Sequence, residues 1–162
     1  MIIRNRLPRA LLHGFTLVEL MVVILIGSIL LAIVVPTYQA QIRKSRRTDA
    51  RNAVLDLAAR EERYFSIYNL YSQLPSDLGY AAPAATGTTW ASVGAIGNGY
   101  YTLNVTKIDP VPATNTPASY TITATAVAGQ LKDLPCRSFV VTNTGQQTAT
   151  DSTGAAATTC WN

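Results

Sequence analysis

The chain has 162 residues, enough for one domain once a long apolar run near the N-terminus is set aside. Charged residues make up only 14% of it, and the formal net charge is +4. From Asn52 onward, five basic residues stand against seven acidic ones, which argues against a generally nucleic-acid-binding domain.

Two basic clusters flank the apolar run. They are Arg4, Arg6 and Arg9 before it, and Arg43, Lys44, Arg46, Arg47 and Arg51 after it. Because both flanks are basic, charge alone leaves the membrane topology open.

Residues 1–14 form a short basic leader, and residues 15–35 form an apolar run that predicts a membrane-spanning helix. At about 1.5 Å per residue, this helix is about 30 Å long, the thickness of a bilayer core. Glu19 lies inside the run, although a carboxylate near the bilayer centre costs about 3 kcal/mol. The run has no small-x-small cleavage site at its far end, whereas Gly14 stands before it. A cut after Gly14 would remove the leader and keep the helix.

Residues 36–71 continue as an amphipathic helix. Pro36 is expected to kink or locally melt the helix, because it lacks a backbone N–H group. The predicted packing face is spaced by threes and fours: Ala50, Val54, Leu57, Ala58, Tyr64, Phe65 and Tyr68. Glu61 and Glu62 are adjacent, so they point apart and are expected to be solvated. Pro75 and Gly79 mark the end of the helical region.

Residues 72–162 are predicted to form a head with β-structure. Residues 100–108 and 119–127 alternate apolar residues with Thr and Tyr, as half-buried strands do. Residues 137–150 contain a strand, a turn at 143–145 and a weaker return strand. The low-complexity stretches 81–99 and 110–119 are interpreted as surface loops. The predicted fold class is α+β, with a long N-terminal helix packed on an antiparallel sheet of about four strands.

Cys136 and Cys160 are the only cysteines. In a chain with a membrane or export segment, such a pair indicates one disulfide in an oxidising compartment. The alternative, two free thiols in a cytosolic protein, fits the apolar segment poorly. A disulfide places the N-terminus inside and the C-terminal head outside.

The stretch GFTLVELMVVILIGSILLAIVVP, residues 14–36, resembles the N-terminus of type IV prepilins and of the pseudopilins of type II secretion. The matching residues are Gly14, Phe15, Thr16, Leu17, Glu19 and Pro36. The resemblance implies cleavage after Gly14 by the prepilin peptidase, N-methylation of Phe15, and assembly into a helical filament through the N-terminal helix.

The C-terminal stretch, in which Trp161 follows the second cysteine, resembles the disulfide-closed end of PilE-type minor pilins, as does the stretch 63–80. Major pseudopilins usually lack such a cysteine pair and carry a calcium-binding loop. Here only the isolated Asp133 and Asp151 are found in that region. A minor pilin is therefore favoured, and a type II secretion pseudopilin is the alternative.

Enzymatic functions lack the necessary groups. The single histidine, His13, belongs to the leader, and the paired cysteines would leave no thiolate nucleophile. We therefore predict no catalytic residues, no cofactor and no metal. A DNA-uptake receptor is the remaining alternative, but only Lys107, Lys132 and Arg137 offer positive charge after the helix.

The predicted partners are other pilin subunits, the prepilin peptidase, the inner-membrane assembly platform and, before assembly, membrane lipid. DNA or a host surface would be further partners, for which the sequence holds no specific signal. The protein is expected in the inner membrane of a Gram-negative bacterium before assembly and in an extracellular pilus afterwards, serving assembly, twitching motility and adhesion. After cleavage, Glu19 has two candidate partners, the Phe15 amine of its own chain or that of a neighbouring subunit.

Overall fold

The computed structural model describes residues 14–80 and 99–161. A helix, α1 (Leu17–Tyr68), is followed by four strands, β1 (Tyr101–Ile108), β2 (Ser119–Ala126), β3 (Ser138–Thr142) and β4 (Gln147–Thr150). Three short 3-10 helices are also present: η2 (Pro112–Thr114) between β1 and β2, η3 (Ala128–Lys132) between β2 and β3, and η4 (Thr158–Cys160) after β4. The chain forms two compact units, Met1–Ala40 and Gln41–Asn162. The long helix and the four strands confirm the predicted α+β class.

The described part of the first unit is helical from Leu17 onward, and its large apolar side chains are exposed. The large apolar residues between Leu17 and Val35 are 46–72% exposed. The helix continues through Pro36 without interruption, so the predicted local melting is wrong. Thr37 donates its hydroxyl to the carbonyl of Ile33 at 3.0 Å, which keeps this polar side chain satisfied within the helix.

The second unit contains the rest of α1, which buries a narrow stripe of side chains. Ala50, Val54, Leu57 and Glu61 recur at spacings of three and four residues, so they share one face of the helix. Ala58, Tyr64 and Phe65 pack partly against the same core. Tyr68 is 59% exposed, so its assignment to the packing face is wrong.

The end of α1 is set by Asn69. This residue has a φ of 55°, in the left-handed region that commonly terminates helices, and its N–H group donates to the carbonyl of Phe65 at 2.8 Å. The helix therefore stops three residues before the predicted boundary at Tyr71. Pro75 and Gly79 lie in the turn that follows, outside the helix.

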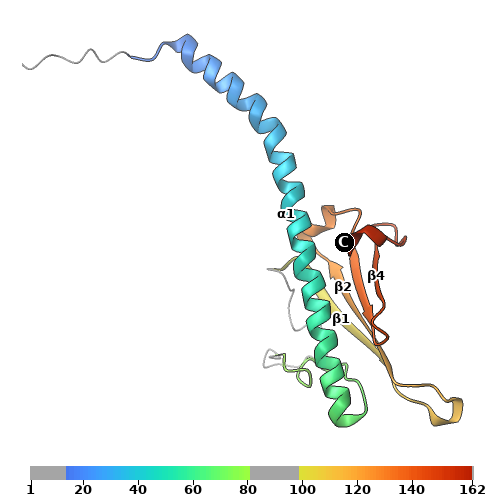
Figure 1. The fold of residues 1–162 in the computed structure, drawn as a ribbon. Coiled ribbons are helices and arrows are strands. Elements are labelled where there is room, and N and C mark those ends of the chain that lie inside the picture. Colours follow the sequence, from blue (N-terminus) through green and yellow to red (C-terminus); the bar gives the residue numbers. More distant parts are fainter. Residues whose placement is uncertain (1–13, 81–98, 162) are drawn as a thin grey trace, which may run out of the picture. The chain divides into compact units, whose positions relative to one another are not determined.

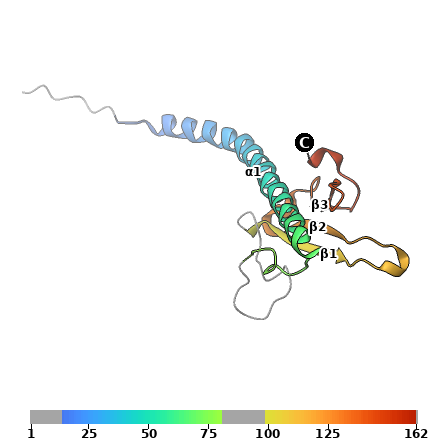
Figure 2. The same cartoon turned by 60° about the horizontal axis from the view of Figure 1, so that its bottom comes forward.

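The four strands form one antiparallel sheet in the order β1-β2-β3-β4. Alternate side chains point to opposite faces, so each strand has one apolar face. The inward side chains are Tyr101, Leu103, Val105, Tyr120, Ile122, Ala124, Phe139, Val141 and Ala149. Both views show the sheet lying along one side of the second half of α1 (Figures 1 and 2).

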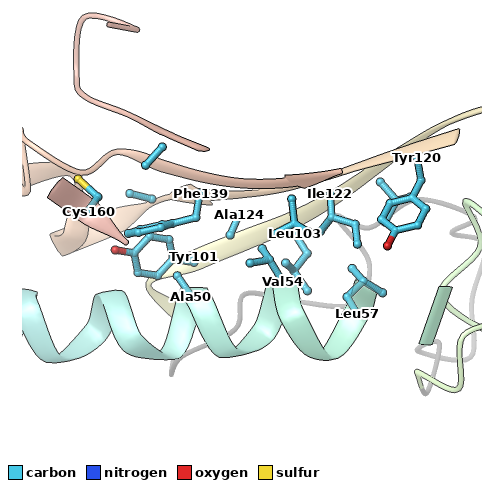
Figure 3. Packing of buried hydrophobic residues seen from close by; sticks show 14 of the residues in the cluster. Ala50, Val54, Leu57, Tyr101, Leu103, Tyr120, Ile122, Ala124, Phe139 and Cys160 are labelled. Atoms are coloured by element: carbon cyan, nitrogen blue, oxygen red, sulfur yellow. The ribbon is translucent and has the colours of Figure 1, made fainter. Parts of the chain in front are cut away.

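The core lies between this part of α1 and the sheet (Figure 3). Val54 and Leu57 of the helix face Leu103 and Ile122 of the strands, and all four side chains are almost wholly buried. Nearer to the disulfide, the helix contributes the small side chain of Ala50, which leaves room for the Tyr101 ring. Small and large residues thus alternate along the interface, as close packing requires.

The outer edge of β4 is covered by the C-terminal segment. Thr150 forms a β-bridge with Ala156, and the N–H group of Ala157 donates to the carbonyl of Ala149 at 2.8 Å. The indole N–H group of Trp161 donates to the carbonyl of Thr148 at 2.8 Å. These bonds continue the sheet past its last strand.

The two predicted loops have different outcomes. The connection between β1 and β2 is mostly exposed, as expected, and contains η2 and a β-bridge between Val111 and Thr116. The other loop, predicted over 81–99, lies outside the described residues except for Gly99.

Candidate functional site

The start of α1 gathers the three residues of the predicted processing and docking motif. Gly14 and Phe15 precede the helix, and the Phe15 side chain is 79% exposed. Glu19 lies in the first helical turn, where a carboxylate is favoured by the unpaired N–H groups of the helix end. The junction and the carboxylate are therefore within one turn of each other.

Thr16 is a functional residue of this turn whose role the sequence analysis missed. Its hydroxyl accepts the backbone N–H of Glu19 at 3.2 Å, as a helix N-cap does. The spacing Thr-x-x-Glu is the sequence pattern of a capping box, so the signal was present. Thr16 thus provides a start for the helix that needs no contact with another chain.

Glu19 has no ion pair among the described residues. In the uncleaved chain the nitrogen of Phe15 belongs to a peptide bond, so it cannot act as a cation. Cleavage after Gly14 would create an amine four residues before Glu19, at the spacing that brings helix side chains together.

The helix from Leu17 onward is long and apolar enough to cross a membrane, with a mean hydropathy of 3.0 in its most apolar window. Two of its hydroxyl side chains form hydrogen bonds within the helix, as a lipid environment favours. Ser28 donates to the carbonyl of Leu25 at 2.8 Å, in the same manner as Thr37.

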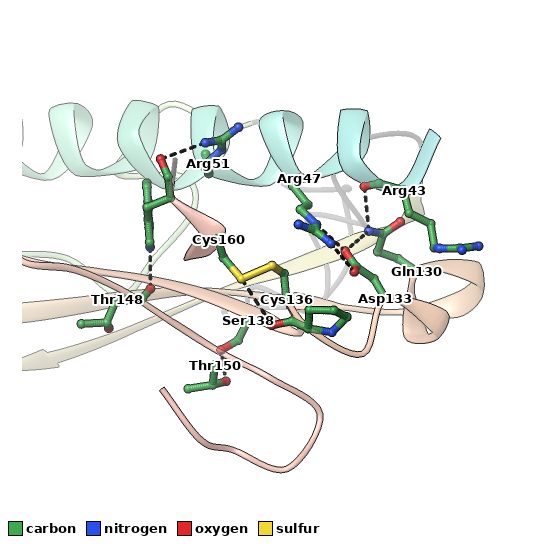
Figure 4. The surroundings of a disulfide bond; sticks show 12 residues. Arg43, Arg47, Arg51, Gln130, Asp133, Cys136, Ser138, Thr148, Thr150 and Cys160 are labelled. Atoms are coloured by element: carbon green, nitrogen blue, oxygen red, sulfur yellow. Dashed lines mark hydrogen bonds and ion pairs between the residues drawn. A yellow bond between two sulfur atoms is a disulfide. The ribbon is translucent and has the colours of Figure 1, made fainter. Parts of the chain in front are cut away.

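The second unit is closed by a disulfide between Cys136 and Cys160, which are 24 residues apart (Figure 4). Trp161 follows directly, and its ring meets the Phe139 ring edge-on at 5.7 Å between centroids. Arg51 of α1 donates to the carbonyl of Trp161 at 2.9 Å. The C-terminal end is thereby tied both to the sheet and to the helix.

Beside the disulfide, Arg47 of α1 forms a bidentate ion pair with Asp133, at 2.8 and 2.7 Å (Figure 4). Asp133 is almost completely buried, and the hydrogen bond to it raises the pKa of Arg47 above its ordinary value. The buried Gln130 donates to Asp133 at 2.9 Å and to the backbone carbonyl of Arg43 at 3.1 Å. This polar clamp fastens α1 to the connection between β2 and β3.

A second buried polar site lies near the C-terminal end of α1. Glu61 is fully buried, and its Oε2 atom accepts the backbone N–H of Ser72 at 3.0 Å. Its Oε1 atom has no hydrogen-bond partner among the described residues. Burial raises the pKa of Glu61 to about 7, opposed by the Ser72 N–H and assisted by nearby Glu62. The expectation that both glutamates are solvated is wrong for Glu61.

The predicted site residues thus fall into two groups. Gly14, Phe15 and Glu19 lie together at the start of α1, and Pro36 lies about five turns further along it. Cys136 and Cys160 lie in the second unit. Among residues 14–80 and 99–161, no three His, Cys, Asp or Glu side chains gather as metal ligands.

Comparison with known proteins gives two family matches. The prokaryotic N-terminal methylation motif matches residues 13–35. The family described as "Type IV minor pilin ComP, DNA uptake sequence receptor" matches residues 36–140. A helix followed by an antiparallel sheet, with a methylation motif at the helix start, agrees with a type IV pilin. The chain belongs to the ComP family of type IV minor pilins.

The chain is also similar to the type IV major pilin protein PilA of Myxococcus xanthus (strain DK1622). The two are 33% identical over 69 residues, which is 43% of this chain and 31% of that protein. The match thus spans about a third of the relative's length. These findings agree with the prediction of a minor pilin. The leader motif and the apolar helix fit a membrane-anchored prepilin.

Proposed function

We propose that the chain is made as a prepilin, cut between Gly14 and Phe15 by the prepilin peptidase, and methylated on the new Phe15 amine. Residues 15–35 then hold it in the inner membrane, with the head on the periplasmic side, until the assembly platform passes it into the pilus. There it serves as a minor subunit in assembly, twitching motility and adhesion. One observation carries this proposal: α1 begins with exposed apolar side chains and a single carboxylate in its first turn.

Glu19 is the residue for which the proposal assigns a specific task. A carboxylate in the bilayer costs about 3 kcal/mol, and the local cap on Thr16 satisfies a backbone N–H rather than the carboxylate charge. The Phe15 amine of the same chain would relieve that charge in the monomer. The amine of a subunit already in the fibre would relieve it only on docking, and would set the axial register of the incoming subunit. We propose the pairing of Glu19 with the Phe15 amine of a neighbouring subunit, because it gives the carboxylate a role in docking. The cap on Thr16 gives it no such role.

The test is incorporation of Glu19→Ala into filaments. The variant should be cleaved and inserted in the membrane normally, yet enter sheared pili at least tenfold less than the native protein. Thr16→Ala is the matched control, because it removes the cap hydroxyl and keeps the carboxylate. Normal incorporation of Glu19→Ala would refute the docking role. Equal loss in both variants would assign the defect to the helix start instead.

Processing is tested by mass spectrometry of the filament-associated protein. The N-terminus should be Phe15 with one added methyl group. Gly14→Leu should leave the leader in place, because the peptidase must bring the backbone close at this junction. An intact leader on assembled native protein would contradict this assignment.

We also propose DNA uptake as a second function, because the family that matches residues 36–140 is described as a DNA uptake sequence receptor. The charges of the described head limit where DNA would bind. Lys107 is paired with Asp109 at 2.7 Å, and Arg137 is partly buried, which leaves Lys132 and the basic side chains of α1 as the main cationic groups of the described residues.

Binding of labelled duplex DNA to the purified mature protein tests this second function. Affinity should fall steeply with salt, as phosphate contacts require, and one short DNA sequence should compete better than its scrambled version. Absence of binding at low salt would refute the DNA function and leave the structural role intact.

A further inference from the structure

The second unit exposes a group of apolar side chains where α1 ends. Four large apolar side chains within eight residues are 36–65% exposed: Ile67, Tyr68, Leu70 and Leu74. We call these four residues the helix-end patch. Tyr68 is held against Tyr64, with 4.5 Å between the ring centroids. Single apolar residues are normal on a protein surface, but several together are typical of a contact site.

A second, smaller group of exposed apolar side chains lies in the connection between β2 and β3. Leu131 and Leu134 are 44% and 58% exposed, and we call them the clamp patch. Each follows directly after a buried residue of the polar clamp, Gln130 or Asp133 (Figure 4). Because the clamp residues are directed to α1, the two leucines are left on the outside of the connection.

The two patches lie at opposite ends of the part of α1 that belongs to the second unit. The clamp is bonded to Arg43 and Arg47, near the beginning of this part, whereas the helix-end patch starts at Ile67. Ile67 follows Arg43 by 24 residues, which is about 36 Å of α-helix. One copy therefore cannot bring its own patches together, but the clamp patch of one copy can meet the helix-end patch of another.

The charges beside the two patches have opposite signs. Lys132 stands between the leucines of the clamp patch, is exposed, and forms no ion pair with any residue that the structure describes. The helix-end patch is flanked by two exposed carboxylates and one guanidinium group, those of Glu62, Asp77 and Arg63. Its surroundings are therefore negative, which favours contact with the clamp patch over contact with a second helix-end patch. The same charge disfavours an anionic membrane surface.

We propose that two copies of the chain associate head to tail through their second units, with the clamp patch of one copy on the helix-end patch of the next. This inference deepens the proposed assembly role, because it assigns a subunit contact to the head in addition to the docking of Glu19. A contact between unlike patches leaves one patch free at each end of the pair, so it extends into a row instead of closing as a dimer.

The contact is weak by itself. The two patches together hold six large apolar side chains, whereas a stable interface uses about 20–30 residues on each side. A weak contact becomes effective where another contact already holds the chains close together, because the second binding event is then intramolecular. The head contact therefore supports assembly without replacing the N-terminal helices.

The test is complementation between two variants of the full mature chain in a non-ionic detergent. Ile67→Asp damages the helix-end patch and Leu134→Asp damages the clamp patch, at positions exposed enough for the fold to be kept. Sedimentation velocity at rising protein concentration should show a series of oligomers for the native chain. Each variant alone should associate at least tenfold more weakly, because the contact would bury an unpaired carboxylate. An equal mixture should form a dimer and nothing longer, because each variant keeps one intact patch.

Two controls separate this contact from other sources of association. Leu55→Asp makes the same kind of change at an exposed position of α1 that lies outside both patches. Glu19→Ala changes a residue of the first unit. Both variants should associate like the native chain, and near-ultraviolet circular dichroism should show the native fold in all four variants.

Five results would overturn the proposal. A mixture that stays monomeric would show that the two patches do not meet. Loss of association in Ile67→Asp but not in Leu134→Asp would indicate a symmetric contact of two helix-end patches. Equal weakening by Leu55→Asp would mean unspecific apolar attraction, and loss in Glu19→Ala would assign the association to the N-terminal helices. A native chain that stays monomeric in detergent yet enters pili normally would refute the head contact and leave the proposed function intact.

Discussion

Replacing the buried Glu61 by glutamine should remove the contribution of this carboxyl to the pH dependence of the stability of the head. Burial raises the pKa of Glu61 from 4.5 to about 7, so the folded protein holds the proton more tightly than the unfolded chain. The stabilising contribution is fully present below pH 4.5 and is lost as the pH rises through 7. At roughly 1.4 kcal/mol per pKa unit, the total is about 3 kcal/mol, most of which disappears between pH 5 and pH 8.

The measurement is urea unfolding of the mature protein in a non-ionic detergent, followed by near-ultraviolet circular dichroism. Other groups also titrate, so the informative quantity is the difference in unfolding free energy between native protein and Glu61→Gln. We expect the native protein to lose about 2–3 kcal/mol relative to the variant between pH 5 and pH 8. Glu62→Gln is the control, because Glu62 is exposed; since its charge helps to raise the Glu61 pKa, this variant should reduce the pH dependence less than Glu61→Gln does. Parallel pH profiles for native protein and Glu61→Gln would refute the reasoning.

Three further changes test the packing of the head by thermal or urea unfolding. Asp133→Ala leaves the Arg47 guanidinium without its carboxylate and should cost about 3 kcal/mol, whereas a cost below 1 kcal/mol would show that the pair is dispensable. Replacing both Cys136 and Cys160 by serine should cost about 3 kcal/mol for a loop of 24 residues, with membrane insertion unchanged. Leu57→Ala should cost 2–5 kcal/mol, because Leu57 is fully buried; a smaller loss would mean that the helix–sheet interface collapses around the cavity.

The strands could be predicted closely because their signal is local. Alternation placed strands over 100–108 and 119–127, and the structure has them at Tyr101–Ile108 and Ser119–Ala126. The processing motif is local in the same sense, since Gly14, Phe15 and Glu19 fall within six residues. The end of α1 also has a local signal, Asn69, which adopts the left-handed conformation. Pro75 and Gly79 are stronger helix-breaking residues in sequence, and they predict an end that is three residues too late.

The buried polar contacts could not be predicted from periodicity. Arg47 and Asp133 are 86 residues apart, and their meeting depends on how the connection between β2 and β3 folds back on the helix. Glu61 is on the apolar face by spacing, but its residue type suggested solvent. The free-energy cost of burying the Glu61 carboxyl group is reduced because the chain turns after Asn69, so that the Ser72 N–H group donates to it.

The covered edge of β4 has a consequence for a chain that is proposed to polymerise. An open strand edge offers unpaired N–H and C=O groups to any passing chain and is a common origin of runaway aggregation. Here the segment that carries Ala156 and Ala157 occupies that edge, and the disulfide at Cys160 limits its dissociation from the strand. Heads crowded together at high local concentration therefore cannot recruit one another as extra strands at β4. Under the proposed function, growth of the fibre would then depend on contacts other than strand pairing at β4.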